Sequence, residues 1–93
     1  MTATLWPILM KPDEVICLAE AVHRLGRTDK ITREICKEFS ICRQVRPGSP
    51  IEVSAPALEM VKHGDIQALE LLREGRRDHP RVSRYFDFLG LSL

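Results

Sequence analysis

Residues 25–33, with the sequence LGRTDKITR, join two segments whose apolar side chains recur at three- and four-residue spacing. Gly26 predicts the end of a first helix, because glycine readily takes the left-handed conformation found there. Thr28 predicts the N-cap of a second helix that runs to about Phe39. Two short helices joined by a glycine-containing turn form the helix-turn-helix pattern. The pattern alone is weak, since many small helical proteins contain such a pair.

The segment before Gly26 predicts a helix that begins within the sequence KPDE at residues 11–14. Proline suits a first helical turn, and the two acidic residues complement the positive end of the helix dipole. The apolar face of this helix is expected to comprise Val15, Ile16, Ala19, Val22 and Leu25. Residues 5–10 (LWPILM) are too short to span a bilayer, and Pro7 makes them an edge strand or an extended arm.

Residues 41–53 predict a β-hairpin, which we call the wing. Two short segments with apolar residues at alternating positions flank the turn cluster PGSP at residues 47–50. Ser54 then predicts the cap of a third helix at residues 55–63, which Gly64 ends. The sequence therefore predicts a mainly α fold with a small β-hairpin, arranged as a winged helix-turn-helix domain over residues 1–64.

Residues 65–93 predict a helical extension. Asp65 is expected to cap a helix over residues 66–72, and a last amphipathic helix follows. The apolar face of that last helix comprises Val82, Tyr85, Phe86 and Leu89. Either it closes the domain's own core, or it binds a neighbouring copy of the protein. In the second case, deletion of residues 85–93 should leave the fold intact and abolish cooperative loading on DNA.

The 93-residue chain has a formal net charge of +1, so its overall charge does not by itself indicate nucleic-acid binding. The charges are unevenly spread: residues 27–47 contain six basic and three acidic side chains, whereas residues 48–75 contain two and five. A basic segment beside an acidic one suits a protein with a single DNA-facing side.

Cysteine and histidine positions favour neither a disulfide scaffold nor a metal site. Cys17, Cys36 and Cys42 are odd in number and show no CxxC spacing, which favours a reduced, cytoplasmic compartment. The three histidines show no metal-ligand spacing. The sequence also contains no nucleophile–base pair, glycine-rich phosphate loop or paired carboxylates in an apolar setting. We therefore expect no enzymatic activity, no metal or other cofactor, and no small-molecule substrate.

From about Met10 to Val61, the chain resembles an excisionase-type winged helix, whose core is shared with the mercury-resistance-type regulators. The resemblance is carried by LGRTDKITR at residues 25–33, by Arg43 and the wing, and by IEVSAPAL at residues 51–58. It implies a recombination directionality factor of an integrative mobile element, which coats or bends attachment-site DNA so that a partner integrase excises the element. It also implies self-association on DNA and a bacterial cytoplasmic location, at the nucleoid when bound.

In this fold the second helix enters the major groove and the wing follows the adjacent backbone. Arg33 is the expected base reader, because a bidentate guanidinium–guanine contact is the commonest specific one. Recognition helices of the family place a polar or small residue before an apolar one, whereas this chain has Ile31-Thr32, so either residue could face DNA. The predicted DNA-binding residues are Thr28, Lys30, Thr32, Arg33, Lys37, Arg43, Gln44, Arg46 and Ser49.

Two alternatives remain open at this point. One is a transcription regulator of the same fold, which the sequence does not separate from a recombination factor. The other is a protein-interaction or inhibitor module that uses a winged fold. The second alternative predicts no salt-sensitive DNA binding and an apolar surface built from Trp6, Tyr85 and Phe86.

Overall fold

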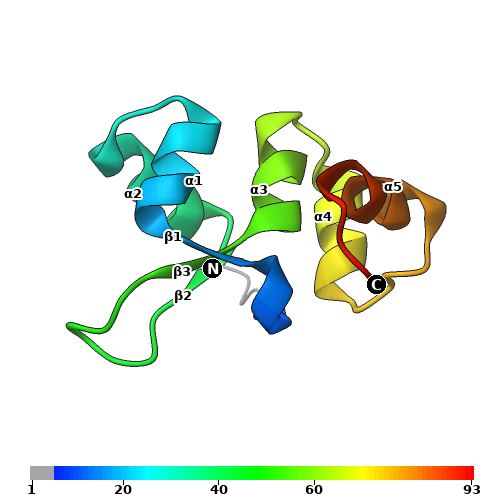
Figure 1. Cartoon of the computed structure of the whole chain (residues 1–93), viewed down its shortest axis with the longest axis horizontal. Coiled ribbons are helices and arrows are strands. Elements are labelled where there is room, and N and C mark those ends of the chain that lie inside the picture. The colour runs from blue at the N-terminus through cyan, green and yellow to red at the C-terminus, as the bar shows by residue number, and fades with distance from the viewer. Residues whose placement is uncertain (1–5) are drawn as a thin grey trace, which may run out of the picture.

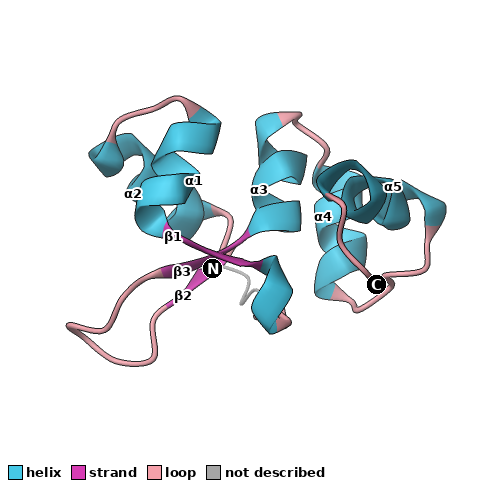
Figure 2. Ribbon diagram, in the orientation of Figure 1, coloured by secondary structure: helices cyan, strands magenta, loops and turns pink. Residues whose placement is uncertain are grey.

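The computed structural model describes residues 6–93, which form five α-helices and a three-stranded antiparallel sheet (Figures 1 and 2). The helices are α1 (Leu18–Leu25), α2 (Asp29–Glu38), α3 (Ala55–Lys62), α4 (Ile66–Arg73) and α5 (Pro80–Leu89). The strands are β1 (Val15–Cys17), β2 (Cys42–Arg43) and β3 (Glu52–Ser54), and a short 3₁₀ helix spans Pro12–Glu14. This confirms the predicted mainly α fold with a small β-hairpin.

The helix-turn-helix is built as its capping residues predict. Gly26 follows α1 in the left-handed conformation, with φ of 70°, and its N–H donates to the carbonyl of Val22. The Thr28 hydroxyl accepts a hydrogen bond from the Ile31 amide and so caps α2. Both signals are local to the chain, which explains why the sequence reveals them.

The start of the first helix was predicted wrongly. Val15 and Ile16 lie in β1 rather than on a helix, and α1 begins only at Leu18. β1 pairs antiparallel with β3, with Ile16 opposite Val53, so the sheet order is β1-β3-β2. β-branched residues suit a strand, but the partner strand lies far along the chain and local periodicity cannot show it.

The N-terminal segment forms no strand among residues 6–11. Ile8 is buried in the core, whereas Trp6 is 72% exposed. The segment is therefore an extended arm, held by the buried Ile8 side chain and by hydrogen bonds from Arg73 and Arg77 to the carbonyls of Trp6 and Leu9. Leu5, which the predicted arm included, lies outside the described residues.

Helix α3 lies at the centre of the molecule, with α1 and α2 on one side and α4 and α5 on the other (Figure 1). A single hydrophobic core includes Ala21 of α1, Leu58 of α3, Leu69 of α4 and Phe86 of α5. The core is continuous across the boundary expected between residues 64 and 65. The helices after α3 thus complete the same core as the winged part.

The residues proposed for self-association are mostly unavailable for it. Val82 and Phe86 are fully buried, Tyr85 is buried, and Leu89 is half-buried. Because Val82, Tyr85 and Phe86 pack inside their own molecule, the prediction that these three bind a second copy is wrong. The alternative that the last helix closes the domain's own core is the one that the structure supports.

Two arginines tie the C-terminal part to the rest of the chain. Arg77 donates two hydrogen bonds to the buried Glu14 carboxylate, at 2.6 and 2.9 Å, and its guanidinium lies 5.2 Å from the centre of the Phe86 ring. Arg73 donates to the carbonyls of Trp6 and Phe39, both at 2.8 Å. Deletion of residues 85–93 would remove Phe86 from this arrangement, so we no longer expect the fold to survive that deletion.

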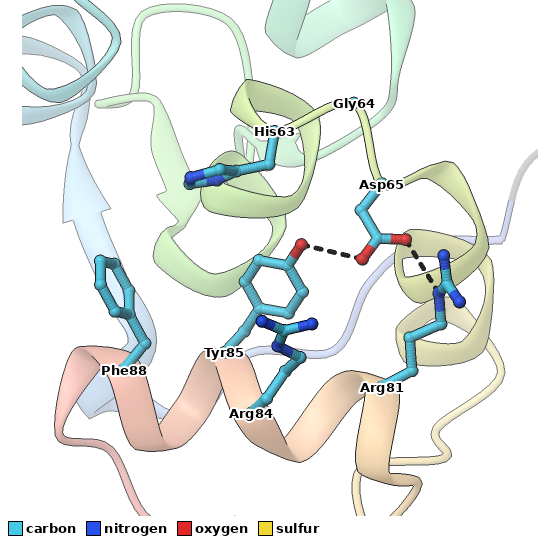
Figure 3. Close-up of a pocket in the computed structure, with 7 residues that line it drawn as sticks. All are labelled: His63, Gly64, Asp65, Arg81, Arg84, Tyr85 and Phe88. Atoms are coloured by element: carbon cyan, nitrogen blue, oxygen red, sulfur yellow. Dashed lines mark hydrogen bonds and ion pairs between the residues drawn. The ribbon is translucent and has the colours of Figure 1, made fainter.

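Asp65 organises the corner between α3, α4 and α5 (Figure 3). Its carboxylate accepts hydrogen bonds from the Ala68 amide, the Arg81 guanidinium and the Tyr85 hydroxyl, at 3.1, 3.0 and 2.8 Å. Burial opposes ionisation of this carboxyl, but the three donors outweigh it and lower the pKa of Asp65 below its ordinary value. The predicted cap of α4 therefore also anchors α5.

Candidate nucleic-acid interface

Three basic side chains lie along one exposed face of α2. Lys30, Arg33 and Lys37 are spaced by three and four residues, so they project from the same side of the helix, and all are exposed. The Nε atom of Arg33 lies 2.6 Å from a carboxylate oxygen of Asp29. An exposed ion pair of this kind contributes only about 0–1 kcal/mol. Arg33 can therefore exchange Asp29 for a phosphate or a base at little cost.

The burial of Ile31 and Thr32 shows which of the two side chains points outward from α2. Thr32 is 0% exposed, and within the described residues its hydroxyl has no hydrogen-bond partner. Ile31 is 40% exposed. The prediction of Thr32 as a DNA contact is wrong, because the helix turns it into the core on the same side as Cys36.

The wing is shaped by a turn at its tip. Pro47 and Gly48 occupy the two central positions, Gly48 has φ of 90°, and the Ser49 amide donates to the Arg46 carbonyl at 3.0 Å. This is the arrangement of a type II turn, which favours proline and then glycine at those positions. The Gln44 side-chain amide also donates to the Ser49 carbonyl at 2.7 Å. The wing therefore has an ordered tip.

The wing carries an arginine in its first strand, β2, and an exposed apolar residue in its loop. Arg43 lies 2.9 Å from a carboxylate oxygen of Glu52 on the neighbouring strand, and Arg46 is exposed near the tip. Val45, between them, is 84% exposed. Sequence reasoning did not select Val45, and the only signal for it was its position between two arginines in an otherwise polar loop.

A groove of about 470 Å³ separates α2 from the wing, and it brings predicted residues together. Arg33 of α2 lines it together with Gln44 and Ser49 of the wing. Leu18 and Ala19, at the start of α1, form another wall. The first amides of a helix lack intrahelical acceptors and carry partial positive charge, so this wall also suits an anion. Sequence reasoning missed it because it began α1 too early.

The other predicted residues do not line this groove. Thr28 is exposed at the start of α2, where its hydroxyl already accepts the Ile31 amide and retains a proton to donate. Lys30 and Lys37 flank Arg33 on the same face of α2, and Arg43 and Arg46 lie on the wing. The exposed basic residues are thus divided between α2 and the wing, the two elements that the groove separates.

A second pocket, of about 670 Å³, lies between the end of α3 and α5 and contains none of the predicted DNA-binding residues. Figure 3 shows Arg81 and Tyr85 directed at the Asp65 carboxylate, with Phe88 farther along α5. Among residues 6–93, no three histidine, cysteine or acidic side chains are grouped to hold a metal ion. Over that same range, no helix is long and apolar enough to cross a membrane.

Comparison with models of protein families, with curated proteins and with solved structures finds no significant match to this chain. The candidate functional surface therefore rests on the geometry of α2 and the wing. That surface combines ordered backbone, exposed basic side chains and a groove between two elements.

Proposed function

We propose that the protein binds double-stranded DNA, with α2 in the major groove and the wing against the flanking backbone. The observation that carries this proposal is the groove in which Arg33, Gln44 and Ser49 meet, because one duplex could contact α2 and the wing together. The major groove of B-DNA is wide enough to admit a helix. Further support comes from the basic face of α2, whose arginine is held only by an exposed ion pair.

Each side chain has a distinct role in this proposal. Arg33 reads a guanine, while Lys30 and Lys37 contact phosphates or base edges on either side of it. Thr28 donates its hydroxyl proton to a phosphate at the start of α2. On the wing, Arg43, Gln44, Arg46 and Ser49 hold the backbone, and the exposed Val45 packs against sugars or base edges in the minor groove.

We further propose that the DNA is an attachment site and that the protein is a recombination directionality factor acting in the cytoplasm with an integrase. Support for this comes from the resemblance of residues 10–61 to excisionase-type winged helices. A single winged domain buries little DNA surface, so several copies or a partner protein would be needed for tight binding. Contacts between copies would use surfaces other than Val82, Tyr85 and Phe86, which are buried.

A mobility-shift titration on duplexes selected from a random library tests the DNA-binding proposal. Arg33→Ala should weaken binding to the selected site by about 5- to 150-fold and relax the sequence preference at one position. Arg46→Ala should weaken all duplexes equally and reduce the slope of log affinity against log salt by about 1. If both variants bind like the wild type, the assignment of α2 and the wing is wrong.

The distribution of bound sites separates the two DNA-binding alternatives. Sites clustered beside the attachment site of an integrative element support the excision factor, whereas sites over promoters support a transcription regulator. The interaction-module alternative is weakened, because Tyr85 and Phe86, which its apolar surface needs, lie in the core. It still predicts the absence of salt-sensitive DNA binding, which the same titrations would reveal.

A further inference from the structure

The connection between α2 and the wing brings two cysteines together. Ser40 follows the helix in the left-handed conformation, with φ of 52°, and the Ile41 amide donates to the Cys36 carbonyl at 3.1 Å. With the Ser40 amide donating to the Lys37 carbonyl at 3.2 Å, this forms a Schellman motif. The motif reverses the chain at the end of α2, and Cys42 follows it as the first residue of β2.

The two thiols have unequal environments. Cys36 is buried in the core, whereas Cys42 is half-buried at the edge of it. A hydrogen bond from the Cys36 thiol lowers the pKa of Cys42 from 9.0 to about 7, and Lys37 adds to this effect. The same contact, together with burial, raises the pKa of Cys36. Cys42, which is more exposed and has the lowered pKa, is therefore the more nucleophilic of the two thiols, and the buried Cys36 is its partner.

We propose that Cys36 and Cys42 form a redox-sensitive dithiol, which hydrogen peroxide oxidises to an intramolecular disulfide joining the end of α2 to the first strand of the wing. The Cys42 thiolate attacks one peroxide oxygen, the O–O bond breaks, and the departing hydroxide takes up a proton to leave as water. The Cys36 sulfur then attacks the Cys42 sulfenic acid, and the S–O bond breaks. The hydroxide lost in this step takes the Cys36 proton and forms a second water. Each thiol loses its hydrogen, and one peroxide is reduced to two waters.

The consequence for DNA rests on the proposed function. A disulfide requires an S–S distance of about 2.05 Å and a Cβ–Cβ distance of about 3.8 Å, which is a tighter geometry than a hydrogen bond between two thiols. The bond would therefore constrain the end of α2 relative to the first strand of the wing. The groove that contains Arg33 and Ser49 lies between these two elements, so oxidation should weaken DNA binding.

The disulfide itself is tested by intact-mass measurement on the Cys17→Ser protein, because Cys17 is exposed and would otherwise link copies. Treatment with hydrogen peroxide should remove 2 Da (two hydrogen atoms), and dithiothreitol should restore the original mass. Digestion should yield one peptide pair linked through Cys36 and Cys42. If peroxide adds oxygen to the protein without a loss of 2 Da, Cys36 and Cys42 do not form the proposed disulfide.

The order of the two steps is tested with two further variants of the Cys17→Ser protein. Cys36→Ala should leave a sulfenic acid at Cys42 that dimedone traps. Cys42→Ala should give no adduct at Cys36, because this sulfur is buried and its pKa is raised. Circular dichroism establishes that each variant is folded. Equal trapping at both cysteines would overturn the assigned roles.

DNA binding by the reduced and oxidised Cys17→Ser protein then tests the consequence. The oxidised protein should bind a selected duplex at least several-fold more weakly, and dithiothreitol should restore the affinity. A disulfide that forms without changing the affinity overturns the regulatory role. A disulfide in a protein that binds no DNA in either state overturns the proposed function and leaves the dithiol established, so the two failures are distinguishable.

Discussion

At the scale of single residues, burial separates Thr32 from its neighbour Ile31 on α2. The threonine lies in the core without a hydrogen-bond partner among residues 6–93, whereas the Ile31 side chain is exposed to solvent. Thr32 lies one helical turn before Cys36, whose side chain is in the core, and it therefore shares the buried face of α2.

Thr32→Val should stabilise the protein. Valine has nearly the same shape and lacks the hydroxyl, whose burial without a partner costs about 1–3 kcal/mol. We expect the free energy of unfolding in urea to rise by about 1 kcal/mol, with DNA affinity unchanged. Thr28→Val is the matched control and should lower the stability by about 1 kcal/mol, because it removes the cap of α2. Weaker DNA binding by Thr32→Val would contradict the inward position of Thr32.

Asp65 should make the stability dependent on pH. Its pKa is lowered in the folded protein because the hydrogen bonds from Tyr85, Ala68 and Arg81 outweigh the effect of burial. The carboxylate therefore contributes stability that is complete above the unfolded pKa of about 3.8 and is lost as the pH falls through the folded value. Asp65→Asn should be less stable than the wild type at pH 7, and the difference should shrink below pH 4. Urea unfolding of both proteins at pH 7, 5, 4 and 3 checks this, and a pH-independent difference would contradict it.

At the scale of elements, the sequence was informative wherever the signal was local. Gly26, Thr28, Ser54 and Asp65 cap the helices as predicted, and the PGSP cluster at residues 47–50 forms the wing turn. Strand β1 was missed because its only support is pairing with a distant strand. The groove between α2 and the wing could not be predicted either, because its walls come from segments that are far apart in the sequence.

The wing turn should matter for DNA binding more than for stability. Gly48 has φ of 90°, where an L-residue is strained by about 1–3 kcal/mol, although a Cβ atom there would meet no neighbour within 4 Å. Gly48→Ala should therefore distort the exposed tip and weaken DNA binding several-fold, with little change in the urea midpoint. Gly48→Asn should retain more affinity, because asparagine tolerates positive φ better. Equal affinities for all three proteins would show that the turn is not used.

At the scale of the whole molecule, the C-terminal helices belong to the fold. Arg73 and Arg77 bind the N-terminal arm and the end of α2, and α5 inserts Phe86 into the core. The apolar periodicity of α5 was visible in the sequence, but whether its face met the same chain or another copy was not. Only the positions of α3 and α4 decide that question.

Two phenylalanines of α5 provide a matched test of this arrangement. Phe86→Ala should cost about 3–5 kcal/mol of unfolding free energy, because it empties a fully buried site. Phe88→Ala should change the stability by no more than about 0.5 kcal/mol, because Phe88 is 71% exposed. Thermal and urea unfolding of both variants measure the difference. A small effect of Phe86→Ala would mean that α5 does not complete the core.

The most direct test of the central claim is fluorescence anisotropy of a labelled 30-base-pair duplex, titrated with protein at 50 and 200 mM salt. The protein should bind and lose affinity steeply at the higher salt, because basic side chains release counterions from the phosphates. Arg33→Ala/Arg46→Ala should bind weakly at both salt concentrations, whereas the control Arg84→Ala, an exposed arginine of α5, should bind like the wild type. Absence of salt-sensitive binding by the wild type, or equal binding by the double variant, would contradict the assignment of α2 and the wing as a DNA-binding surface.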